Sequence, residues 1–272
     1  MSTGSSIDQA WYNRFYGEPA DPRLVLAPEI VERYRRLRQP RIFHLERVHQ
    51  LAGDLRGRRC LYIGCGVEAS AVLFAMKGAE LWALDLAVEA LRRQKQMALA
   101  NGTEGRSHFV ASPCERLPFR SGSFDVVIGI GILHHLQDDL DAPCSELARV
   151  LKTNGRAVFE EPIARSRMLQ RIRSWLPVPP PRDASPRCRP LMPDALDVFA
   201  RHFHVDAEFF LFLGRLNRLL LGGQPLELAP PWKRWMAQSL HYIDTLLLRI
   251  PGLDRLAGVV VLDLRLPQEA GK

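Results

Sequence analysis

The segment RRCLYIGCGVEASAVLFAMKGAELWALDLA, residues 58–87, decides the fold of this chain. It contains an apolar run that ends at Gly64, a helical stretch that ends at Gly78, and a second apolar run that ends at Asp85. Short apolar runs of this kind are typical of strands buried on both faces, so the segment predicts a strand–helix–strand unit with parallel strands. Gly64 and Gly66 lie at the carboxyl end of the first strand, where open parallel sheets bind their ligands.

Strand and helix patterns continue to alternate after this unit. Residues 138–155 predict a helix that ends at Asn154-Gly155, and residues 193–203 predict another. The alternation predicts a doubly wound α/β sheet that is mostly parallel. The further strands that we expect are RSHFVAS (106–112), the start of GSFDVVIGIGILHHL (122–136), RAVFEEP (156–162), HVDAEFFLF (204–212) and AGVVVLDLRLP (257–267).

Bulk composition excludes several classes of protein. The 272 residues carry a formal charge of +7 but no run of five Lys or Arg, so we do not expect nucleic acid as a partner. The five cysteines are scattered without metal-ligand spacing, which predicts neither a disulfide framework nor a metal site. The first residues lack the basic and apolar regions of a signal peptide, and we expect a cytoplasmic protein.

The glycine turn and Asp85 together indicate the kind of ligand. Asp85 ends the second strand about twenty residues after the turn, where a carboxylate accepts hydrogen bonds from ribose hydroxyls. A dinucleotide fingerprint would need a third glycine at Ala69, and Glu68 would repel a pyrophosphate there. A nicotinamide-dependent dehydrogenase is therefore a remote alternative. An adenosine ligand with a cationic centre, such as S-adenosylmethionine, fits these residues better.

Four blocks of the chain carry a shared pattern: LYIGCGVEA (61–69), LWALDLA (81–87), VASPCERLPFRSGSFDVVIGIGILHHL (110–136) and ELARVLKTNGRAVFEEP (146–162). Together these blocks resemble class I S-adenosylmethionine-dependent methyltransferases, of the small-molecule group called methyltransferase type 11. This resemblance implies a Rossmann-like sheet of seven strands in the order 3-2-1-4-5-7-6, with the last strand antiparallel and helical inserts attached. It also implies S-adenosylmethionine as cofactor and a small molecule as methyl acceptor.

The resemblance also divides the chain and assigns cofactor-binding positions. We expect one domain, residues 1–272, made of a helical lid (1–57), a cofactor-binding core (58–162), acceptor-side inserts (163–192 and 214–252) and a final strand (253–267). The sequence departs from the family at three positions, because Tyr62, Glu68 and Pro113 replace an acidic residue, a glycine and an aspartate. The cofactor-binding residues expected are Tyr16, Tyr62, Gly64, Cys65, Gly66, Asp85, Leu86, Cys114, Glu115 and Ile130.

Candidate catalytic residues follow the fourth and fifth strands. His134 and His135 lie at the mouth of the predicted cleft, and an imidazole can take a proton at neutral pH, with His135 slightly favoured. Glu160 and Glu161 end the fifth strand, and strand alternation would turn one of them, Glu161 in our assignment, toward the site. The alternatives are that LHHL is a packing motif and that the glutamates are solvated or pair with neighbouring arginines.

Several functions stay open at the level of the sequence. We expect methyl transfer to an oxygen of a glycoside, polyketide, quinone or lipid-linked metabolite. Apolar stretches beside arginines at residues 209–223 and 241–253 favour a lipid-linked acceptor or peripheral membrane contact, although a buried helical cap would also explain them. The alternatives are an RNA methyltransferase and a non-catalytic, methyltransferase-like partner protein. The oligomeric state does not follow from the sequence.

Overall fold

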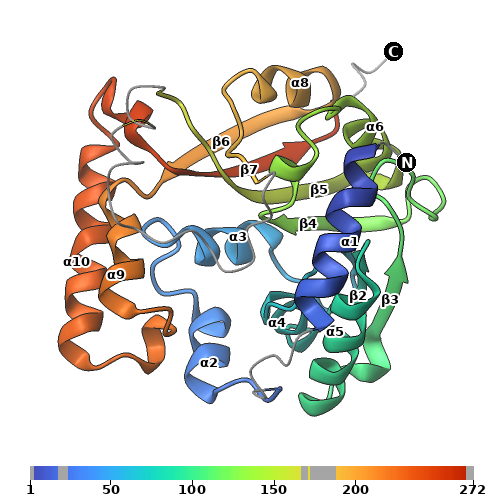
Figure 1. Ribbon diagram of the computed structural model, residues 1–272, viewed down its shortest axis with the longest axis horizontal. Helices are drawn as coiled ribbons and strands as arrows, with labels where there is room; N and C mark the ends of the chain where they lie inside the picture. Colours follow the sequence, from blue (N-terminus) through green and yellow to red (C-terminus); the bar gives the residue numbers. More distant parts are fainter. Residues whose placement is uncertain (1–2, 18–23, 167–170, 172–187, 268–272) are drawn as a thin grey trace.

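The computed structural model describes residues 3–17, 24–166, 171 and 188–267. These residues form one seven-stranded sheet and the helices around it (Figure 1). The strands follow the order β3-β2-β1-β4-β5-β7-β6, as predicted. β1 to β5 are parallel, and β7 is antiparallel to both β5 and β6, which confirms the predicted fold. The strands are Arg59–Ile63 (β1), Glu80–Asp85 (β2), Ser107–Ala111 (β3), Phe124–Ile130 (β4), Leu151–Pro162 (β5), His204–Phe210 (β6) and Val259–Arg265 (β7).

Helices pack on both faces of the sheet because successive strand residues alternate between two apolar clusters. In β1, Leu61 belongs to the cluster that includes α6 and α8, whereas Tyr62 belongs to the cluster that includes α3, α4 and α5. The described helices are Thr3–Gly17 (α1), Pro28–Arg36 (α2), His44–Ala52 (α3), Ser70–Met76 (α4), Val88–Ala100 (α5), Asp141–Val150 (α6), Ala195–His202 (α8), Asn217–Leu221 (α9) and Pro231–Leu247 (α10). The described 3₁₀ turns are Glu104–Arg106 (η1), Leu133–His135 (η2), Leu213–Leu216 (η3), Leu226–Leu228 (η4) and Leu253–Leu256 (η5).

The two predicted inserts differ in how much of each the structure describes. The chain between β6 and β7 contains η3, α9, η4 and α10, so residues 214–252 are largely helical, as expected. Most of the predicted insert 163–192, including its proline- and arginine-rich part, lies outside the described residues. No helix among the described residues combines the length and the apolar character that crossing a membrane would require.

The predicted helix 138–155 is wrong at its end. α6 ends at Val150, and Leu151 already pairs with Phe124 of β4 as the first residue of β5. Leu151 is buried in the core, and this burial outweighs the helix-ending signal of the Asn154-Gly155 pair. The predicted final strand, residues 257–267, is shorter too, because β7 extends only over Val259–Arg265, and η5 occupies residues 253–256 before it.

The imidazole of His49, a residue of α3, is buried against α2 and α4. His49 stacks on Phe74 with ring centroids 4.0 Å apart and also faces Tyr34. Burial, together with the positive charges of Lys77 and Arg33, holds the pKa of His49 well below its usual value of 6.5. His49 is therefore neutral in the folded protein over the neutral and mildly acidic range.

We expect His49 to make the protein less stable as the pH falls. The unfolded chain binds a proton at His49 below about pH 6.5 whereas the folded chain does not, so stability is full above that pH and declines below it. One such proton contributes a slope of up to about 1.4 kcal/mol per pH unit. Denaturant unfolding between pH 7 and pH 5 should show a shallower decline for His49→Phe than for wild type. The exposed His204→Phe serves as control, and a His49→Phe slope equal to wild type would contradict the expectation.

Candidate active site

The turn after β1 forms the floor of the predicted cofactor crevice. Gly64 and Gly66 both have positive φ angles, +62° and +48°, which disfavour any side chain. A Cβ on Gly64 would also lie 2.6 Å from the side chain of Ile132, which follows β4. The absence of a side chain at Gly64 therefore lets the loops after β1 and β4 approach each other.

Asp85 ties this turn to the end of β2. Its carboxylate accepts hydrogen bonds from the backbone N–H of Gly66 at 2.9 Å and of Ala87 at 2.8 Å. Burial raises the pKa of Asp85, although the backbone hydrogen bonds oppose that shift. The carboxylate thus lies beside the glycine turn, and its contact with a ribose stays a prediction.

Gln94 is a residue of the crevice that the sequence did not reveal. Its side chain comes from α5 and is 1% exposed. Its amide nitrogen donates to the backbone carbonyls of Cys65, Gly66 and Glu68 over 2.8–3.1 Å. Three carbonyls of one turn are thereby held by a single side chain, so Gln94 fixes the shape of the turn from below. In the sequence, the only signal for such a role was a polar residue on the predicted apolar face of a helix.

α1 lies across the carboxyl ends of three strands. The Gln9 side chain donates to the carbonyl of Leu86 at 3.0 Å, just after β2. The Tyr16 hydroxyl lies 3.2 Å from the point that a Cβ on Gly66 would occupy. The Tyr12 hydroxyl lies 3.2 Å from Nε2 of His135, just after β4. α1 therefore contacts the loops after β1, β2 and β4, and its role as a lid stays a prediction.

Cys114 and Glu115, two further predicted cofactor residues, lie in the loop after β3. Ser112 after β3 donates its N–H to the carbonyl of Asp85, which brings the loop with Cys114 and Glu115 beside the end of β2. Within the described residues, Oε2 of Glu115 is buried without a hydrogen-bond partner. Ile130 ends β4 at the same edge of the sheet.

Tyr62 lies elsewhere. Its ring is buried in the core against Phe74, and its hydroxyl bonds Ser70. Burial holds the pKa of Tyr62 well above 10. The side chain therefore packs under α4, and its proposed contact with a cofactor stays a prediction.

Glu161 holds the turn that carries the two histidines. Its side chain is 0% exposed. The carboxylate accepts hydrogen bonds from the backbone N–H groups of Ile132, Leu133 and His134 over 2.7–3.2 Å. It also accepts from Nδ1 of His134 at 2.8 Å. Glu161 therefore points at η2 from within the core, which makes it a positioning residue rather than a group open to an acceptor.

The two histidines differ in charge. Burial alone would lower the pKa of His134, but hydrogen bonds to Cys188 and Glu161 and the charge of Glu161 raise it to about 10. Burial and the neighbouring His134 lower the pKa of His135 to about 3. With the rings 4.0 Å apart, one imidazole is charged and the other neutral at pH 7. Such opposite shifts in adjacent groups are typical of functional sites.

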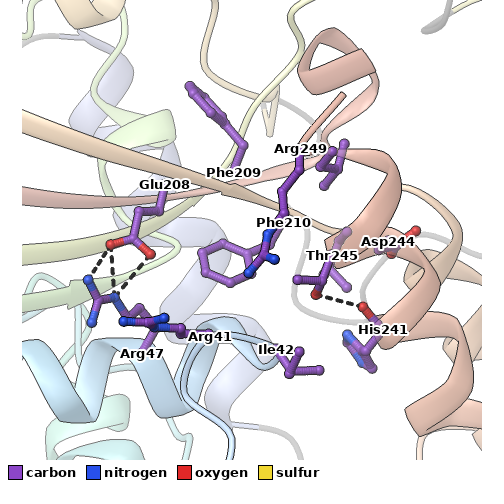
Figure 2. A pocket seen from close by; sticks show the side chains of 12 residues that line it. Arg41, Ile42, Arg47, Glu208, Phe209, Phe210, His241, Asp244, Thr245 and Arg249 are labelled. Atoms are coloured by element: carbon purple, nitrogen blue, oxygen red, sulfur yellow. Dashed lines mark hydrogen bonds and ion pairs between the residues drawn. The ribbon is translucent and has the colours of Figure 1, made fainter. Parts of the chain in front are cut away.

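A cavity of about 430 Å³ lies between β6, α3 and α10 (Figure 2). Phe210 gives it an apolar wall, Arg41 and Arg47 reach it from the side of α3, and Arg249 reaches it from beyond the end of α10. Arg47 is paired with Glu208, its Nε lying 2.9 Å and 3.1 Å from the two carboxylate oxygens. The residues predicted to bind the cofactor do not line this cavity.

Comparison with known proteins identifies the domain. Residues 61–159 match the family model described as a methyltransferase domain. These residues hold the glycine turn, Asp85 and the His134–His135 pair. This part of the chain therefore resembles a methyltransferase domain.

Individual relatives of the chain are distant. The ubiquinone biosynthesis O-methyltransferase of Bordetella avium is 31% identical over 116 residues, which cover 42% of this chain and 47% of the relative. The chain thus spans about half the length of that curated relative.

Two solved structures share the fold over nearly the whole chain. A geranyl diphosphate C-methyltransferase from Streptomyces coelicolor, solved with Mg²⁺, geranyl diphosphate and S-adenosyl-L-homocysteine, has a TM-score of 0.61 at 14% identity and covers 96% of this chain and 98% of its own. The [4+2]-cyclase SpnF has a TM-score of 0.59 at 17% identity, covering 97% of each chain. At these identities the likeness establishes the fold only.

We expect Gln94→Leu to weaken cofactor binding without unfolding the protein. The carbonyls of residues 65, 66 and 68 would lose their buried donor, at a cost of about 1–3 kcal/mol in turn stability. Calorimetric titration with S-adenosylhomocysteine should show a weaker Kd. Lys95→Ala, on the exposed side of the same helix, is the control. Unchanged affinity in Gln94→Leu would show that the turn keeps its shape without this side chain.

Proposed function

We propose that this protein binds S-adenosylmethionine under α1 and transfers its methyl group to an oxygen of a small metabolite. The observation that carries the proposal is the hydrogen bond from Gly66 N–H to Asp85, which places a half-buried carboxylate beside the glycine turn. A carboxylate there suits the ribose, and the open turn suits the amino-acid end of the cofactor. The complexes of the geranyl diphosphate methyltransferase with S-adenosylhomocysteine and of related folds support this choice of cofactor.

The chemistry is a displacement at the methyl carbon. The acceptor hydroxyl loses its proton, and its oxygen forms a bond to the methyl carbon as the bond from that carbon to sulfur breaks. Sulfur keeps the bonding electrons, so the sulfonium becomes the neutral thioether of S-adenosylhomocysteine. Because the methyl group is already activated, the protein contributes mainly by holding the reactants in line, which can supply about 7–11 kcal/mol.

The acceptor end of the proposed site is the turn with His134 and His135. This turn follows β4, next to the loop after β1, and α1 covers both through Tyr12 and Tyr16. We assign removal of the acceptor's proton to the neutral imidazole of His135, from which the proton passes to water, because His134 is already charged at pH 7. Glu161 fixes the position of both imidazoles through the backbone of η2 and the ring of His134.

The acceptor that we propose is apolar and carries an anionic group. The 430 Å³ cavity offers aromatic surface and arginines together, which suits such a molecule. On its wall, Phe210 packs near His44, whose Nδ1 lies 3.1 Å from Glu160 of β5. A lipid-linked intermediate with a phosphate or carboxylate group meets this description, and the name of the Bordetella relative, a ubiquinone O-methyltransferase, supports an apolar acceptor.

The outer face of α10 supports an apolar acceptor independently. Trp235 is 70% exposed and Leu246 is 65% exposed. The described part of α10 has one acidic residue, Asp244, which is buried and bonds the backbone of residues 212–214. An apolar helix face flanked by basic residues fits the surface of an anionic membrane. The exposed apolar residues of α10 and its end are Trp232, Trp235, Met236, Tyr242, Ile243, Leu246 and Ile250.

We expect Asp85→Ala to weaken binding of S-adenosylmethionine by about 1–3 kcal/mol, or about 5- to 150-fold in Kd, because the ribose loses a half-buried acceptor. Calorimetric titration measures the Kd directly, with Asp206→Ala on the outer strand as control. Equal affinity in wild type and Asp85→Ala would show that the ribose does not bind at Asp85. A wild-type protein that binds no cofactor at all would favour the non-catalytic alternative.

A second test concerns the acceptor class. Purified protein should co-sediment with vesicles of phosphatidylcholine containing phosphatidylserine. The double variant Trp235→Ser, Leu246→Ser should reduce the bound fraction at least about tenfold, because each of the two side chains contributes roughly 1.5–3 kcal/mol when it is buried. Leu99→Ser, an equally exposed position on α5, is the matched control. Binding that is equal in the double variant and wild type would exclude α10 as the contact.

A further inference from the structure

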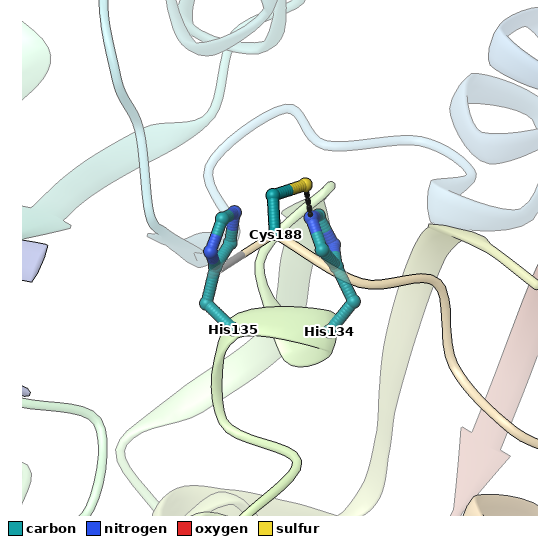
Figure 3. Close-up of side chains that lie close together, drawn as sticks. All are labelled: His134, His135 and Cys188. Carbon is teal, nitrogen blue, oxygen red and sulfur yellow. Dashed lines mark hydrogen bonds between the residues drawn. The ribbon is translucent and has the colours of Figure 1, made fainter. Parts of the chain in front are cut away.

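Cys188 joins the two histidines at the acceptor end of the proposed site (Figure 3). Its Sγ lies 3.1 Å from Nε2 of His134. One ligand atom each from His134, His135 and Cys188 lie within 4.8 Å of one another. The cysteine stands 53 positions after His135 in the sequence, so no local spacing connects these residues.

The donor set is one that divalent transition metals prefer. Two imidazole nitrogens and one thiolate suit Zn²⁺, whose bonds to nitrogen and sulfur are about 2.0–2.3 Å long. Tetrahedral geometry then places ligand atoms roughly 3.3–3.8 Å apart, within the spread of this cluster. Three protein ligands leave a fourth position open, as in catalytic zinc sites.

Two further observations favour a ligand here. Nδ1 of His134 is held by the carboxylate of Glu161 at 2.8 Å, which leaves Nε2 facing the cluster. Histidines that bind metals usually donate their other ring N–H to a carboxylate in this way. In addition, Nδ1 of His135 is buried and has no hydrogen-bond partner among the residues that the structure describes.

We propose that His134, His135 and Cys188 bind one divalent transition-metal ion of the zinc type at the acceptor end of the methyltransferase site. Its role in catalysis rests on the proposed function: the open position would bind the acceptor oxygen and lower the pKa of its hydroxyl, whose proton leaves to water. His134 and His135 then activate the acceptor through the metal, and Glu161 holds the cluster from behind.

The test is a titration of metal-free, reduced protein with Co²⁺, which reports a thiolate ligand through a charge-transfer absorption band. We expect one Co²⁺ per chain, a charge-transfer band, and displacement of the ion by Zn²⁺. Cys188→Ser should lose the band, and this half-buried loop position tolerates the change of one atom. Glu161→Gln should weaken the affinity about 10- to 100-fold while keeping the band. Thermal melts show whether each variant is folded.

Cys144→Ala and His202→Ala, which lie on other elements, should behave like wild type. Wild-type protein without the band would overturn the proposal, and so would a band that persists in Cys188→Ser. The same metal-free protein is titrated with S-adenosylmethionine, so failure of the metal site and failure of the cofactor site are separate results. Full methylation by metal-free protein would remove the catalytic role of the metal and leave the proposed function standing.

Discussion

The arrangement of the site depends on one buried carboxylate, that of Glu161. An ionised carboxylate without partners would be very costly in the core of the sheet. Three backbone N–H groups and one imidazole surround this one, and hydrogen bonds to a charged group stabilise by about 1.5–3 kcal/mol each. The turn after β4 therefore has a single well-defined shape, although it lies where the sheet ends.

Other parts of the crevice follow from that shape. With the turn fixed, Ile132 fills the space that a side chain on Gly64 would need. The same turn places His135 against Tyr12, which helps to seat α1 over the strand ends. On the opposite side, Gln94 and Asp85 hold the glycine turn through its carbonyls and one N–H. Buried polar side chains thus fix both walls of the crevice while its opening is covered by a helix.

The sequence predicted the sheet well because its signals there are local. Apolar runs, helix-ending glycines and the spacing from Gly64 to Asp85 each depend on neighbouring residues, and the strand order followed from the resemblance. The end of α6 was wrong because strand pairing of Leu151, a long-range effect, overrode a local stop signal. Strand alternation alone could not show that Glu161 faces backbone amides. Gln94 and Cys188 were missed because their partners come from distant segments.

The outer strand β6 also affects how the molecule behaves in a crowded solution. An edge strand exposes unpaired backbone groups that can recruit strands from other chains. His204, Asp206 and Glu208 place ionisable side chains at every second position along this edge. A foreign strand that docked here would have to bury those groups, so β6 resists the edge-to-edge stacking that leads to fibrous aggregates.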